Sequence, residues 1–110
     1  MYSRRPPQLG DIMVIDYSFL NAIVVVNDRS TDPYVTNGQG SPTNPAYRMD
    51  YIVGVKYDKG SFGPCIGSIW LNDDPNHMSI VGVNGYPLPL DFYGVNVPEA
   101  IEAMGGTVIY

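Results

Sequence analysis

The chain contains one cysteine, Cys65, and one histidine, His77, among its 110 residues. A single cysteine cannot form a disulfide within the chain, which excludes the small secreted scaffolds that depend on such bonds. Zinc sites need several thiolate or imidazole ligands, so the composition also argues against a zinc protein. Any catalytic arrangement that needs a histidine base would have to use His77.

Glutamate and lysine are also scarce, with two residues of each, whereas the chain has 12 glycines, 10 prolines and nine tyrosines. Good helix formers are therefore few, and residues typical of strands and turns are abundant. Ten prolines are difficult to place in a helical protein, because each removes a backbone donor. This composition predicts a mainly β protein.

Long hydrophobic runs are missing. The longest, at residues 22–26, is far too short to span a bilayer. Asp11 and Asp16 interrupt the apolar residues that follow the N-terminus, so the sequence predicts no secretory signal peptide. We expect a protein that works in the cytoplasm, or in a virion assembled there, without a membrane partner.

Positive charge is limited as well, since the formal net charge is −5 and the isoelectric point about 4.4. A protein that binds nucleic acid through the phosphate backbone needs a basic surface, so we expect no nucleic-acid partner. The acidic residues are mostly aspartates scattered singly or in pairs, as is typical of turns and solvated surfaces.

The clearest pattern in the chain is the alternation of residues 47–58. Side chains of a strand point alternately to its two faces, so this segment predicts one long strand with an apolar face and a wet face. The apolar face would carry Tyr47, Met49, Tyr51, Val53, Val55 and Tyr57, and the other face would carry Arg48, Asp50, Ile52, Gly54, Lys56 and Asp58.

Other segments complete a mainly β fold. Strands are predicted at residues 11–17, 22–27, 65–72, 77–83 and 107–110, turns at 58–61 and 84–85, and a short helix at 98–104. Residues 86–93 hold two prolines and belong at a sheet edge or outside the sheet. We expect an antiparallel sandwich or small barrel of six to eight short strands with one short C-terminal helix. An extended N-terminal arm at 1–10 would precede a single β domain at 11–110.

A long polar segment occupies residues 28–46. Loops of this length are uncommon in compact domains and are usually functional or disordered. Apart from Tyr34 and Val35, this segment has too few apolar residues to pack on itself.

Candidate chemistry is sparse. Asp73, Asp74, Asn76 and His77 could offer oxygen and nitrogen ligands to calcium, but the same residues form turns without a metal, and we expect no metal. A cross-strand Cys65–His77 pair is geometrically possible, although a small buried thiol and a polar residue at a hairpin end are the ordinary roles of such residues. We expect neither a cofactor nor an enzyme.

Candidate partner-binding residues come from the arm and from the tyrosines. Arg4, Arg5, Pro6 and Pro7 could form a peptide ligand or a cationic arm that docks onto an acidic neighbour, including another copy, or a disordered terminus. Tyrosines pack in cores and are enriched at interfaces, so both roles stay open for them. The predicted partner-binding residues are Arg4, Arg5, Pro6, Pro7, Tyr34, Tyr47, Tyr51 and Tyr57.

These features favour a non-enzymatic structural or interaction protein that acts as a homo-oligomer, either a trimer or a dimer. The composition is similar to that of small accessory proteins of phage virions, such as capsid decoration or tail proteins, which would place it in a larger assembly. One alternative is a small soluble inhibitor or ligand-binding module that uses the 28–46 loop. Another is an enzyme that uses Asp or Tyr side chains at strand ends.

Overall fold

A computed structural model describes residues 5–56, 67–83, 91–92 and 95–96. These residues form seven strands: β1 (Asp11–Tyr17), β2 (Leu20–Ser30), β3 (Ala46–Lys56), β4 (Ser68–Asn72), β5 (Met78–Val83), β6 (Asp91–Phe92) and β7 (Val95–Asn96). The described part of the chain contains no helix.

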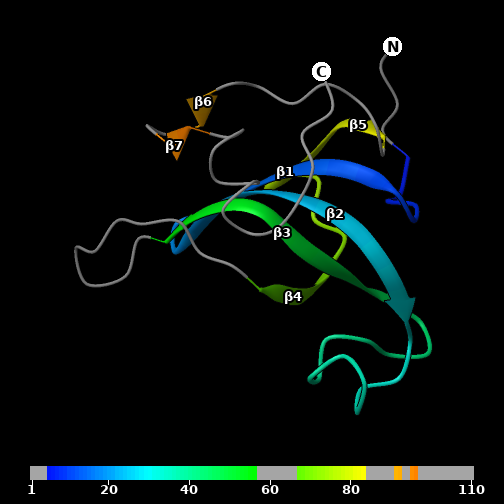
Figure 1. The fold of residues 1–110 in the computed structure, drawn as a ribbon. Coiled ribbons are helices and arrows are strands. Elements are labelled where there is room, and N and C mark those ends of the chain that lie inside the picture. The colour runs from blue at the N-terminus through cyan, green and yellow to red at the C-terminus, as the bar shows by residue number, and fades with distance from the viewer. Residues whose placement is uncertain (1–4, 57–66, 84–90, 93–94, 97–110) are drawn as a thin grey trace.

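Five of the strands form one antiparallel sheet in the order β4-β3-β2-β1-β5. The long strands β1, β2 and β3 curve together in an arch, with β4 and β5 at the two edges (Figure 1). The two short strands β6 and β7 pair with each other in a separate ribbon. The prediction of a mainly β, antiparallel fold is therefore confirmed.

The central strand β2 is buried on both faces over residues 20–26, which suits their β-branched composition. Ile23 and Val24 point to opposite faces, and both are fully buried. A two-residue turn at Ser18 and Phe19 joins β1 to β2, with Tyr17 paired to Leu20. Since pairing with β3 continues as far as Ser30, β2 is longer than the predicted strand at 22–27.

Strand β3 shows the predicted alternation over its first half. Tyr47 and Met49 are buried in the core, whereas Arg48 and Asp50 lie on the other face and form an ion pair at 3.1 Å. A bulge then shifts the register, so that Tyr51 pairs with Val24 but Val53 pairs with Ile23. The period of two that runs through residues 47–57 of the sequence is therefore interrupted inside the sheet.

Three register shifts curve the sheet. Besides the one near Val53, a second lies between Val26 and Asp28 of β2, and a third lies where Ile12 and Met13 of β1 pair with β5. Each bulge adds a residue to one strand and increases the local twist.

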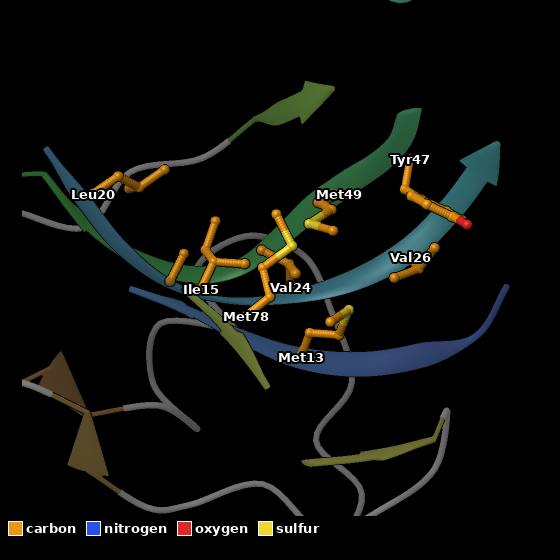
Figure 2. Packing of buried hydrophobic residues seen from close by; sticks show 9 residues of the cluster. Met13, Ile15, Leu20, Val24, Val26, Tyr47, Met49 and Met78 are labelled. Atoms are coloured by element: carbon orange, nitrogen blue, oxygen red, sulfur yellow. The ribbon is translucent and has the colours of Figure 1, made fainter. Parts of the chain in front are cut away.

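A cluster of buried side chains occupies one side of the curved sheet, where residues of β1, β2, β3 and β5 meet (Figure 2). Its buried members are Met13, Ile15, Leu20, Ala22, Val24, Val26, Tyr47, Met49 and Met78. Ile69 and Leu71 of β4 and Ile80 of β5 pack against this cluster. Three methionines near the centre provide flexible side chains that fill irregular space between strands.

Several predicted elements lie outside the described residues: the turns at 58–61 and 84–85, the helix at 98–104 and the strand at 107–110. Within the proline-bearing segment 86–93, the described Asp91–Phe92 pair belongs to the β6-β7 ribbon and not to the five-stranded sheet.

Candidate interaction surface

The segment between β2 and β3, residues 31–45, is folded into defined turns. The carboxylate of Asp32 accepts a hydrogen bond from the Tyr34 N–H at 2.9 Å, and its carbonyl accepts one from the Thr36 N–H at 3.1 Å. Asp32 thus closes an Asx turn and a helical turn together. Short polar side chains stabilise turns in this way, which explains why a segment with little apolar content has a defined shape.

Thr36 is the buried centre of this loop, with none of its surface exposed. Its hydroxyl donates to the Asp32 carbonyl at 2.9 Å and accepts from the Gly40 N–H at 2.6 Å. A Cβ atom on Gly40 would lie 2.7 Å from the Ser30 carbonyl oxygen and 2.9 Å from the Thr36 hydroxyl. The close approach of these backbone segments therefore requires glycine at position 40.

The chain reverses at Asn37 and Gly38, which have φ angles of 56° and 85°. Asparagine and glycine are the residues that adopt this left-handed region most readily. The Gly38 N–H donates to the Pro33 carbonyl at 2.8 Å and closes the turn. The Asn-Gly pair predicts a turn from the sequence alone. Which side chains surround this turn is shown only by the structure.

Asn72, at the end of β4, fastens the loop to the sheet. Its side-chain amide donates to the carbonyls of Gln39 at 2.7 Å and Pro45 at 3.2 Å. Two backbone bonds between Ser41 and Asn44 close a further small turn. The loop is therefore held at the sheet as well as within itself.

This framework presents two apolar side chains to solvent. Tyr34 is 96% exposed and Val35 is 53% exposed, and both lie on the turn that Asp32 closes. We call these two residues the loop tip. The predicted partner-binding residue Tyr34 is thus placed on the surface by a defined backbone.

A groove with a volume of about 340 Å³ lies beside β4. It is lined by Phe19 from the β1-β2 turn, by Asn37 and Gln39 from the loop, and by residues 68–71 of β4. No charged side chain is among these lining residues. Sequence reasoning missed this groove because its three segments are far apart along the chain.

The described part of the arm folds back onto the sheet. The Arg5 guanidinium makes two hydrogen bonds to the Asp11 carboxylate, at 2.7 and 2.8 Å, and the Gln8 N–H adds a third at 2.8 Å. These donors, led by the Arg5 hydrogen bonds, hold the pKa of Asp11 below its ordinary value although burial opposes the shift. Pro6 is exposed, Pro7 is buried, and Arg4 lies outside the described residues.

Two of the remaining predicted tyrosines are described, and neither lies at the loop tip. Tyr47 is only 5% exposed and belongs to the core, and Tyr51 is half-buried against it. Tyr57 lies outside the described residues. The structure therefore does not bring Tyr47 or Tyr51 together with Tyr34.

His77 lies in a small polar and aromatic cluster between the β1-β2 and β4-β5 turns. Its Nδ1 is 2.8 Å from a carboxylate oxygen of Asp74, and its ring stacks on Tyr17 at 4.7 Å. Burial, together with the nearby charges of Asp74 and Asp73, raises the pKa of the Tyr17 phenol. No hydroxyl or thiol of the described residues is hydrogen-bonded to His77, and Cys65 lies outside them.

Among the described residues, no group of three or more His, Cys, Asp or Glu side chains is arranged to hold a metal ion. That part of the chain also contains no helix with the length and apolar character needed to cross a membrane. No protein-family model matches the chain, and comparisons with curated proteins and with solved structures found no match.

Proposed function

We propose that this chain is a non-enzymatic interaction protein that docks onto another protein through the loop tip. The observation that carries the proposal is the near-complete exposure of Tyr34 on a turn fixed by hydrogen bonds. Tyrosine is enriched among residues that dominate binding energy, because its ring is large and its hydroxyl can still bond.

The rigidity of the loop favours binding. Association costs free energy when a loop must be ordered at the interface, and a preformed loop avoids much of that cost. Here the buried Thr36 and the left-handed turn at Asn37 and Gly38 hold the backbone before any partner is present. The partner would need a pocket that accepts a phenol ring beside a small apolar patch for Val35.

We propose that the sheet belongs to a closed sandwich or small barrel of six to eight strands with a helix at 98–104. The chain would act as a dimer or trimer, or within a larger assembly such as a phage capsid or tail. The described sheet, with two edge strands, supports an assembly that covers its edges.

The proposal can be tested by placing a photo-crosslinking amino acid at position 34 in cells that naturally express the chain. We expect crosslinks to one defined protein, identified by mass spectrometry, and a Tyr34→Ala variant should lose binding to that protein by about tenfold or more. Its melting temperature should stay unchanged, because the side chain is exposed.

The matched control is position 9, since Leu9 is also apolar and is 65% exposed but lies outside the loop. A crosslinker there should give no defined product, and Leu9→Ala should bind normally. The absence of a defined product at position 34, or equal products at both positions, would contradict the proposal.

A further inference from the structure

The register of β4 against β3 decides which backbone N–H and C=O groups of β4 are available to bond to a further strand. The Tyr51 N–H donates to the Gly67 carbonyl at 2.8 Å, which makes this a hydrogen-bonded pair of the antiparallel ladder. Such pairs alternate, so the next ones toward the end of β4 are those of Ile69 and Leu71. The N–H and C=O groups of Ser68 and Trp70 therefore point away from β3.

The groove beside β4 is lined by four consecutive residues of the strand, 68–71. Ser68 and Trp70, whose N–H and C=O groups point away from β3, are among them. The groove therefore adjoins residues that have outward backbone groups.

Two of the devices that protect an edge strand, proline and charge, are missing from the residues of β4. Its five residues include no proline and no charged side chain, and within the described residues it pairs only with β3. Exposed strand edges without such protection pair readily with another extended chain. Beside this edge, Asn72 fastens the 31–45 loop through the Gln39 carbonyl, which fixes the position of the loop at the groove.

The lining also indicates what kind of chain would fit. Trp70 and Phe19 offer aromatic surface, and none of the described lining residues carries a charge that could pair with a charged ligand. Asn37 and Gln39 carry amide groups that can both donate to and accept from a peptide backbone. A volume of about 340 Å³ suits a few residues.

We infer that the outer edge of β4 binds a short, extended, uncharged peptide segment as an added antiparallel or parallel strand. The backbone of Ser68 and Trp70 supplies the hydrogen bonds, and Trp70 and Phe19 hold alternate side chains of the peptide. This contact is separate from the loop tip, so a Tyr34→Ala variant should retain it.

The test uses capped pentapeptides in which threonine alternates with one of Val, Ile, Leu, Phe, Tyr or Trp, titrated into the full chain labelled for NMR. We expect at least one peptide to shift the amides of Ser68 and Trp70 and to slow their hydrogen exchange. The same peptide N-methylated at alternate residues, which cannot complete the ladder, should not bind.

Two substitutions at the exposed position 68 distinguish the contribution of the backbone N–H to peptide binding from that of the side chain. Ser68→Pro removes an outward N–H and none of the N–H groups that bond to β3, so the affinity should fall about fivefold or more. Ser68→Ala keeps that N–H and should bind like the original chain.

The inference is overturned if none of the peptides binds, or if the N-methylated peptide binds equally well. It is also overturned if Ser68→Ala weakens binding as much as Ser68→Pro. Protection of the Ser68 and Trp70 amides before any peptide is added would overturn it too, because the edge would then already be paired.

Discussion

At the scale of single residues, Asp11 shows how one side chain can join the arm to the sheet. It is only 2% exposed at the start of β1, and a buried carboxylate is costly unless its oxygens are paired. Arg5 supplies two hydrogen bonds and an opposite charge from six residues away. Arg5, which the sequence predicts to be a partner-binding residue, therefore ties the arm to the sheet.

We predict that Arg5→Ala lowers the free energy of unfolding by about 1–3 kcal/mol, because it leaves a buried carboxylate with fewer donors. Arg29→Ala is the matched control, since Arg29 is exposed on β2, and its effect should stay within about 0.5 kcal/mol. Urea denaturation of both variants at neutral pH provides the measurement, and equal stabilities would contradict the structural role of the ion pair.

The same ion pair predicts a dependence of stability on pH. The pKa of Asp11 is lowered in the folded state, chiefly by the Arg5 hydrogen bonds, so the unfolded chain binds more protons in acid. The pair stabilises the fold at pH values above 3.8, which is the ordinary pKa of this carboxyl group. Its contribution is lost as the pH falls below that value. Stability measured at descending pH should fall more steeply for the original chain than for Arg5→Ala, and parallel curves would refute the assignment.

At the scale of elements, the 31–45 loop and the β4-β5 turn are both built from polar side chains that bond to nearby backbone. In the loop these side chains are Asp32 and Thr36, and in the turn Asp74 takes the same role. Such turns need no apolar core of their own. The loop also positions Tyr34 and Val35 of the loop tip and two residues that line the groove, Asn37 and Gln39.

For the loop, we predict that Gly40→Ala destabilises the protein by about 1–3 kcal/mol, because the added methyl group must displace the Ser30 carbonyl or the Thr36 hydroxyl. The amide resonance of Thr36 should move as the loop shifts. Thr43→Ala, at an exposed position of the same loop, should leave the melting temperature unchanged. If Gly40→Ala melts like the original chain, the loop is looser than its hydrogen bonds indicate.

For the β4-β5 turn, we predict no binding of calcium. One oxygen of the Asp74 carboxylate lies 2.8 Å from His77 Nδ1, and the other accepts the Asn76 N–H at 3.1 Å. The turn therefore uses both oxygens without a metal. Millimolar calcium should leave the melting temperature where a chelator leaves it, since a ligand of the folded state must raise it. A rise of several degrees would show that these ligands are available.

At the scale of the whole molecule, the described sheet has two edges, β4 and β5, of which β5 exposes apolar side chains. Val81 is 39% exposed and Val83 is 56% exposed, and β5 has no charged residue to discourage pairing. Closed symmetric assembly is a common way to cover such an edge.

We therefore predict a homo-oligomer, either a dimer or a trimer, at low micromolar concentration. Light scattering measures the mass, and Val83→Lys should shift it toward the monomer because it replaces exposed apolar surface at the β5 edge with a charge. Ser79→Lys adds the same charge to β5 but removes no apolar surface, so it should shift the mass less. A monomeric mass for the original chain would contradict the prediction and favour the ligand-binding module over the assembly.

What the sequence determined by itself was local. The strand at 11–17 has the same bounds as β1, and the alternation from Tyr47 to Tyr51 correctly separates core from surface, because these patterns depend only on the period of a strand. Tertiary structure decided the rest. Pairing with β3 set the length of β2, a bulge moved Val53 into register with Ile23, and the curved sheet brought Phe19, Asn37 and Trp70 to one groove. Contacts between distant segments depend on register and curvature, which arise only when the strands pair.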